Sequence, residues 1–276
     1  MAPPLAERIP DKPSFRAFAL PCYRDVFERE PASGPNRKLT VSSRLVLTAL
    51  NETIVNCRLC PRLVAWREQV AAEKRASYRD ESYWGRPLTG FGDPKARLLI
   101  CGLAPAAHGG NRTGRVFTGD QSGNWLFASL HRAGFANQPT SVHCRDGLKL
   151  RDCYITACVR CAPPANRPTT EERDNCLNYL LKEVPLLTQV RVIVPLGGFA
   201  WTGILRILRQ LGHRAPSQSH FGHGAEATVG PYWLLGCYYP SQQNTFTGRL
   251  TAPMMDAIWR RAKGSWPRIT PVTTMD

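Results

Sequence analysis

Four short apolar runs alternate with helical patterns along this chain of 276 residues, and this alternation limits its fold more than any other feature. Each run is short and apolar enough for a buried strand; the runs are 96–101, 153–158, 190–196 and 232–238. Helical patterns lie between them at 122–133, 170–184 and 200–211, and another follows at 253–263. Strands separated by helices form a parallel sheet covered on both faces. We therefore predict an α/β fold on a four-stranded parallel sheet.

The region before the first strand divides into two parts. Residues 1–40 contain seven prolines and no periodic pattern, so we expect an extended N-terminal tail there. A helix is expected over 61–78, with Pro61 in its first turn. Thr169 and Glu172 have the spacing of a capping box at the start of a later helix. Because no internal repeat is visible, we predict one domain over 41–270 behind the tail.

The charge of the chain indicates a polyanionic partner. Lys and Arg number 36 against 21 Asp and Glu, which gives a net charge of +15. A positive field of this size favours nucleic acid, and no basic amphipathic helix points to a membrane surface instead. No apolar run approaches the ~20 residues of a membrane span, and the N-terminus lacks the apolar stretch of a signal peptide. We expect a cytoplasmic protein that acts on nucleoid DNA.

The segment 102–120, GLAPAAHGGNRTGRVFTGD, is the strongest candidate for a functional loop. It follows a predicted strand and has five glycines among nineteen residues, without helical or strand periodicity. Glycines at the carboxyl end of a strand let the backbone approach a ligand closely. The loops 159–169, 196–199 and 239–249 follow the other strands, so all four should meet at one edge of the sheet.

Ten cysteines in a reducing compartment need an explanation other than disulfides. Cys57 and Cys60 form a C-x2-C pair, and Cys161 and Cys176 lie where a loop and an inward helix face could complete four ligands. Cys153 and Cys158 are expected to point into the sheet. Spacing alone leaves two alternatives open: the later cysteines are core residues, or the four bind zinc or an iron–sulfur cluster.

Several motifs together resemble those of the family 5 (type B) uracil-DNA glycosylases. They are the loop 102–120, the run RCAPPANRPTTEERDNC, the segment SQQNTFTGRLT, and two upstream stretches, YWGRP at 83–87 and GFGDP at 90–94. The likeness covers roughly residues 56–263. It implies a three-layer α/β/α sandwich and a [4Fe-4S] cluster on Cys57, Cys60, Cys161 and Cys176. It also implies removal of uracil, and of other deaminated bases such as hypoxanthine, from DNA in base excision repair.

The resemblance also suggests roles for single residues. Phe117 would stack on the flipped base, and Asp120 would position the attacking water and stabilise the positively charged sugar. Asn166 matches a position of the base pocket. Gly102, Ala104 and His108 belong to the same loop as Phe117 and are further candidates for contact with the substrate. The alternatives are that Asp120 is a helix cap and that Phe117 is a core residue.

One departure from the family lies just before the segment Pro-Ser-Gln-Gln-Asn. The family carries a histidine there, and this chain has Tyr239. A phenol can donate a hydrogen bond to the departing base, but it is larger than imidazole and is not a cation near neutral pH. Gln242, Gln243 and Asn244 should lie beside the DNA strand. Arg112, Arg115 and Arg249 are candidates for phosphate contacts.

These inferences predict a monomeric, monofunctional uracil-DNA glycosylase that leaves an abasic site. No motif lysine is placed to form a Schiff base, so no lyase step is expected. The alternative is a metal-stabilised protein that binds lesions or nucleic acid without cutting. A nucleotide-binding α/β enzyme is disfavoured, because no phosphate-binding glycine motif follows a strand.

Overall fold

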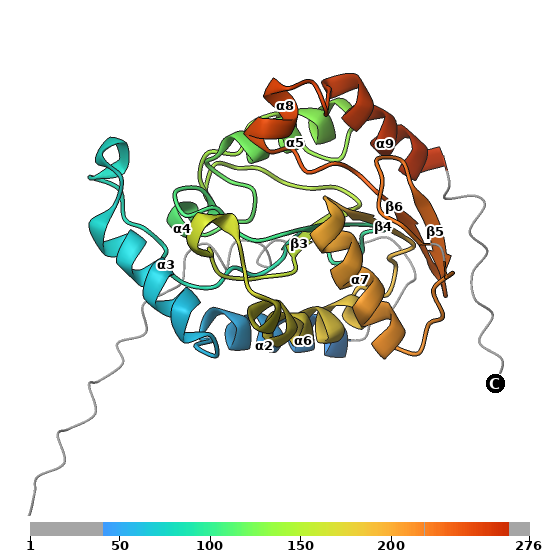
Figure 1. Ribbon diagram of the computed structural model, residues 1–276, viewed down its shortest axis with the longest axis horizontal. Helices are drawn as coiled ribbons and strands as arrows, with labels where there is room; N and C mark the ends of the chain where they lie inside the picture. The colour runs from blue at the N-terminus through green and yellow to red at the C-terminus, as the bar shows by residue number, and fades with distance from the viewer. Residues whose placement is uncertain (1–40, 218, 265–276) are drawn as a thin grey trace, which may run out of the picture. The chain divides into compact units, whose positions relative to one another are not determined.

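A six-stranded sheet forms the centre of the computed structural model, which describes residues 41–217 and 219–264 (Figure 1). The side chains of residues 41–43 are not part of this description, and the predicted tail 1–40 lies outside it. The strands are β1 (Phe91–Gly92), β2 (Leu98–Gly102), β3 (Cys153–Ala157), β4 (Val192–Pro195), β5 (Glu226–Val229) and β6 (Tyr232–Leu235).

The four predicted strands are the central ones and are parallel, in the order β3-β2-β4-β6. In their register Ile100 is opposite Ile155 on one side and Val194 on the other. All residues of β2, β3 and β4 are buried, as expected for strands covered on both faces. The prediction missed β1 and β5, which pair antiparallel at the two edges.

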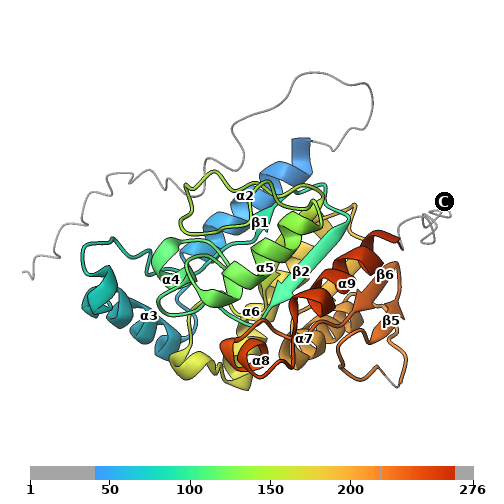
Figure 2. The same cartoon turned by 90° about the horizontal axis from the view of Figure 1, so that it is seen from above.

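Helices cover both faces of the sheet and complete three layers (Figures 1 and 2). Their bounds are α2 (Val41–Val55), α3 (Pro61–Glu73), α4 (Gly110–Thr113), α5 (Gln121–Arg132), α6 (Thr170–Leu186), α7 (Gly198–Gln210), α8 (Gln242–Phe246) and α9 (Ala252–Gly264), with short 3-10 turns at Ala76–Tyr78 and Pro164–Asn166. None of the helices in the described part of the chain has the length and apolar character that a bilayer span requires.

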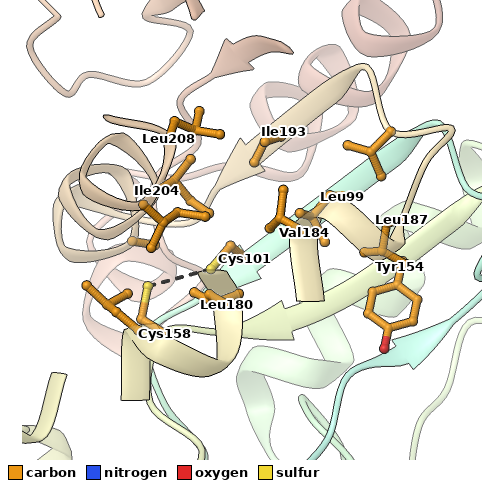
Figure 3. Packing of buried hydrophobic residues seen from close by; sticks show 14 of the residues in the cluster. Leu99, Cys101, Tyr154, Cys158, Leu180, Val184, Leu187, Ile193, Ile204 and Leu208 are labelled. Carbon is orange, nitrogen blue, oxygen red and sulfur yellow. Dashed lines mark hydrogen bonds between the residues drawn. The ribbon is translucent and has the colours of Figure 1, made fainter. Parts of the chain in front are cut away.

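Two separate hydrophobic cores lie on the two faces of the sheet. The helices α2, α6 and α7 pack on one face, where Leu50, Leu180 and Ile204 meet Leu99 and Ile193 of the strands. Figure 3 shows part of this core, including the buried thiols of Cys101 and Cys158 with their sulfurs 3.6 Å apart. The helices α5 and α9 pack on the other face (Figure 2). The predicted three-layer α/β/α arrangement is thereby confirmed.

Local sequence signals explain where the main helices begin. The capping box of α6 is present: the Thr169 hydroxyl accepts from the Glu172 N–H, and the Glu172 carboxylate accepts from the Thr169 N–H. Pro61 occupies the first turn of α3, as predicted. However, α3 ends at Glu73 instead of continuing to residue 78. The prediction also missed α2, α4 and α8.

Candidate active site

The loop 102–120 connects β2 to α5 and is an ordered part of the fold. Its first residues are fixed to the end of β3, because the Cys158 and Val159 N–H groups donate to the carbonyls of Gly102 and Leu103 at 3.0 and 2.9 Å. Its middle forms the short helix α4, which lies near α3 (Figure 1). A loop held in this way can place side chains at the sheet edge with little freedom.

The loop forms most of a narrow pocket at this edge. The pocket has room for little more than one water molecule, and its lining residues are Ala104, Pro105, Ala106, Val116, Phe117, Asp120, Ala157 and Tyr239. The structure therefore brings Tyr239 together with three candidates of the loop 102–120: Ala104, Phe117 and Asp120. Their proximity is the geometrical condition on which the sequence interpretation depended.

Close backbone contacts hold the Phe117 ring in place. Phe117 is buried and has a φ of +53°, a left-handed conformation that is strained for a bulky residue. The edge of its ring packs on Gly102, where an added Cβ would come within 2.7 Å of Cζ. Its carbonyl oxygen packs against Gly123, where no Cβ would fit. Gly102 thus contributes to the pocket by making room for Phe117, and it is not itself a lining residue.

Asp120 caps a helix and lines the pocket at the same time. Its Oδ1 accepts from the Gly123 N–H at 2.9 Å, which caps α5. Its Oδ2 lies against the backbone of Gly109. Burial raises the pKa of Asp120, although the Gly123 and Ser122 N–H groups and the Arg112 charge oppose this shift. Asp120 can therefore cap α5 with one carboxylate oxygen and line the pocket at the same time.

Tyr239 lies beside Phe117 in the pocket, with ring centroids 5.8 Å apart and planes inclined by 36°. Burial and the nearby Asp120 carboxylate raise the pKa of Tyr239, and a hydrogen bond with the Ser122 side chain opposes them. The phenol is therefore protonated at neutral pH and available as a donor. A base stacked between two rings needs about 3.5 Å on each side, or about 7 Å between the rings. The centroids of Phe117 and Tyr239 are 5.8 Å apart, so a base can lie between them only if one ring moves.

The short helix α8 and the following turn form an exposed rim next to Tyr239. The Asn244 side chain donates to the Tyr239 carbonyl at 2.8 Å and so attaches α8 to the pocket. Gln242, Gln243 and Arg249 are exposed. Phe246 is 80% exposed, and the sequence analysis did not single it out. The sequence does contain a signal for it: Phe246 is an aromatic residue in a polar segment, preceded by Gln-Gln-Asn-Thr and followed by Thr-Gly.

Two of the candidate phosphate-binding arginines are buried and have partners inside the protein. Arg115 is 5% exposed and makes a two-pronged contact with Asp146 at 2.8–2.9 Å. Arg112 is 7% exposed, pairs with Glu81 and donates to the Gly119 carbonyl at 3.1 Å. The structure does not support phosphate contacts for either residue. Both guanidinium groups instead hold the pocket loop in shape.

His108 and Asn166 do not line the pocket. His108 Nδ1 lies 3.0 Å from the Tyr83 hydroxyl, and its carbonyl accepts from Arg112, so the residue supports the loop from behind. Asn166 is exposed and has a φ of +55° in the turn after Cys161. The predicted place of Asn166 in the base pocket is therefore not supported, because its side chain lies on the surface of that turn.

The four candidate ligand cysteines gather at the junction of α3, α6 and the loop after β3. Cys60, Cys161 and Cys176 are buried together with Leu63 and Val159, and Cys57 is partly exposed. Burial is the main cause that raises the pKa of Cys161 to about 11 and that of Cys176 to about 12.

Nitrogen donors surround this group. Arg67 donates to the Cys161 sulfur at 2.9 Å and Asn175 to the Cys60 sulfur at 3.7 Å. Within 41–217 and 219–264, no three His, Cys, Asp or Glu side chains converge as ligands of a single ion. Cys153 and Cys158 are core residues, as predicted.

Comparison with known proteins places this geometry in a family. The model of the uracil DNA glycosylase superfamily matches residues 89–263, a range that includes the pocket loop, Tyr239 and α8. The chain belongs to this superfamily. A type-5 uracil-DNA glycosylase of Mycobacterium bovis is 56% identical over 216 residues, which cover 78% of this chain and 80% of the relative.

Two relatives of lower identity to this chain are also named type-5 uracil-DNA glycosylases. The type-5 uracil-DNA glycosylase of Thermus thermophilus is 50% identical over 78% of this chain and 96% of its own length. That of Pyrobaculum aerophilum is 45% identical over 76% of this chain and 88% of its own length. The resemblance to type-5 enzymes inferred from the motifs is thus confirmed.

Proposed function

We propose that this protein hydrolyses the N-glycosidic bond of uracil in DNA and leaves an abasic site for base excision repair. The observation that supports this most directly is that Phe117, Asp120 and Tyr239 line one pocket at the sheet edge. Membership of the superfamily and the names of the type-5 relatives support the same reaction. Hypoxanthine is a further substrate that the family resemblance implies.

The substrate must reach the pocket as a flipped nucleotide, because the target base is inaccessible inside a duplex. Flipping costs a few kcal/mol, which contacts to the DNA backbone must offset. Arg249 is exposed for such a contact, and Gln242 and Gln243 are exposed on the same rim. Phe246 is an apolar side chain that can fill the gap left by the flipped base.

The chemical step separates charge between the sugar and the base. As the bond between C1′ and the base nitrogen breaks, its electron pair leaves with the base, and C1′ becomes cationic. A carboxylate at Asp120 stabilises this cation and orients a water toward C1′. The water then bonds to C1′ and loses one proton, so that the products are a neutral base and an abasic sugar.

Tyr239 is placed to stabilise the departing base. Its protonated hydroxyl can donate to the base oxygen on which negative charge develops. The donor is weaker than a cationic imidazole and the ring is larger. The ring also lies next to Phe117, so a flipped base requires a small displacement of one of the two aromatic side chains.

The four cysteines fit a [4Fe-4S] cluster better than a single metal ion. Such a cluster takes one thiolate per iron, so the sulfurs surround it and do not converge on one point. Cys60, Cys161 and Cys176 are buried together, with the partly exposed Cys57 near them. The guanidinium of Arg67 is buried beside them, and its Nε has no hydrogen-bond partner among the described residues, which favours negative charge next to it. When bound, the cluster would link the segment 57–60 to 161–176 and stabilise the fold.

The decisive test is incubation of the purified chain with a uracil-containing oligonucleotide, followed by alkali, which cleaves only at abasic sites. We expect cleavage at the uracil, and strand scission before alkali is not expected. Asp120→Asn keeps a side-chain oxygen for the α5 cap and removes the charge, so it should lower the single-turnover rate by about 100-fold. Binding of the oligonucleotide without cleavage by the wild type would instead identify a lesion-binding protein.

A further inference from the structure

One guanidinium group spans two of the four candidate ligand cysteines. Arg67 lies on α3, and its side chain is 2% exposed. One terminal nitrogen donates to the Cys161 sulfur at 2.9 Å, and the other donates to the Cys57 carbonyl at 3.1 Å. Arg67 therefore contacts both halves of the cysteine group, which lie about a hundred residues apart in the sequence.

Among the residues that the structure describes, Glu68 supplies the one carboxylate paired with Arg67, and this contact is long and half-exposed. The nearby carboxylate of Glu68 is 3.8 Å away and 45% exposed, and it makes its short ion pair with Arg58. The Nε of Arg67 has no hydrogen-bond partner. A buried cation without a compensating anion is strongly unfavourable.

A second buried arginine nearby shows the usual solution. Arg160 is 1% exposed and forms an ion pair with the fully buried Glu183, which Thr156 and Tyr154 also contact. The charge of Arg160 is therefore matched within the fold by a carboxylate. Arg67 has only the long contact with the half-exposed Glu68 carboxylate, whereas the Cys161 sulfur lies 2.9 Å from its guanidinium, so an anionic sulfur there, as in a ligand thiolate, would match the charge of Arg67 much more closely.

We propose that Arg67 is a positioning residue for the [4Fe-4S] cluster, which compensates the charge of the thiolates and protects the cluster from loss. The inference rests on the cluster of the proposed function. A buried positive charge beside a cluster stabilises its more electron-rich state. Arg67 therefore makes the cluster easier to reduce and harder to extract.

The backbone of Arg67 has a separate structural role that substitution of its side chain leaves intact. Its carbonyl accepts from the Asn111 side chain at 3.1 Å, which connects α3 to the pocket loop. Replacement of the guanidinium therefore tests the effect on the cluster without removing this contact.

The test compares three variants of the full chain purified with its cluster. Arg67→Met removes the charge at similar length, and Arg67→Lys keeps the charge but loses the two-pronged contact. Arg261→Met is the matched control, because Arg261 is 54% exposed and forms its ion pair with Glu226, outside the cysteine segments 57–60 and 161–176. Iron and sulfide content, the midpoint potential in a dithionite titration, and the rate of bleaching by a chelator are measured.

We expect Arg67→Met to shift the midpoint potential to more negative values and to bleach about tenfold faster or more, as for other residues behind metal ligands. Arg67→Lys should keep a potential near that of the wild type but bleach faster, and Arg261→Met should match the wild type in both. A fully loaded Arg67→Met with unchanged potential and bleaching rate would overturn the proposal. If Arg67→Met does not load, an unchanged bleaching rate in Arg67→Lys overturns it. A wild type that contains zinc and no iron refutes the cluster itself.

Discussion

A methyl group on Gly109 should disable the pocket while leaving the fold intact. An added Cβ would overlap Asp120 Oδ2 and would lie 2.9 Å from its Cγ and 3.0 Å from its Cβ. Because non-bonded carbon and oxygen atoms are normally at least about 3.2 Å apart, Oδ2, which would lie 2.1 Å from the added Cβ, must retreat by about 1 Å or more. Rotation of the side chain can move the carboxylate aside, but it does not move the Asp120 Cβ, which would lie 3.0 Å from the added Cβ. Gly109 also has φ −100° and ψ −104°, outside the regions that residues with a side chain favour, so a small local shift of the loop backbone accompanies the substitution.

The expected effect of Gly109→Ala is on the rate. A misplacement of about 1 Å costs on the order of 100-fold in rate, so we expect a loss of this size in single-turnover cleavage of uracil-containing DNA. The α5 cap is weakened at the same time, which costs about 0.5–2 kcal/mol of unfolding free energy. The assay is alkali cleavage of the oligonucleotide, with thermal melting measured in parallel.

The matched control is Gly222→Ala, at a glycine outside the pocket. Its added Cβ would meet only the Ala225 side chain, at an ordinary 3.6 Å. We expect this variant to cleave and melt like the wild type. A folded Gly109→Ala variant with a rate within twofold of the wild type would show that the position of the Asp120 carboxylate does not limit the reaction.

Four further predictions concern the pocket and its rim. Tyr239→His should raise the single-turnover rate on uracil-containing DNA, because imidazole is a smaller and stronger donor; an unchanged or lower rate counts against the role given to Tyr239. Burial raises the pKa of Asp120, so on acidification the rate should begin to fall at a higher pH than the titration of an exposed aspartate would give. A rate that stays constant down to pH ~4 would exclude an essential carboxylate. The raised pKa means that the Asp120 carboxyl binds a proton more tightly in the folded state than in the unfolded state, so its ionisation at neutral pH destabilises the fold. Asp120→Asn removes this cost, so the variant should melt at or above the wild-type temperature. Phe246→Ala should lower the rate on duplex more than on single-stranded DNA, whereas Val142→Ala, at another exposed apolar residue, should change neither; equal losses on both substrates would speak against gap filling.

The sequence was sufficient to predict the central sheet because three of its four strands are fully buried. Runs such as 98–102 and 192–195 are apolar throughout, which is the pattern of a strand between two helical layers. The edge strand β1 has only two residues and includes Gly92, so it has no periodicity to detect. Helix α2 did have a signal, since Leu47, Leu50 and Ile54 recur at helical spacing and are buried.

The roles of the charged loop residues could not be predicted from the sequence. Arg115 has the context of a phosphate ligand, a basic residue in a glycine-rich loop. Its partner Asp146 is 31 residues further along the chain, and only the fold brings them together. The same limit applies to Arg67, whose contact with Cys161 joins residues 94 positions apart. Local patterns indicate which residues are polar, but the partner of a buried charge depends on tertiary contacts.

Several departures from local structural rules occur at the pocket. Phe117 has a positive φ that glycine would adopt more easily, and Asp120 is a carboxylate whose burial raises its pKa. Gly102 and Gly109 are positions where any side chain would displace one of these two groups. None of these features contributes to stability by itself, and the packed sheet must supply the free energy that maintains them. This is expected if their arrangement serves a bound nucleotide, because preorganised groups avoid the cost of reorientation when charge develops in the reaction.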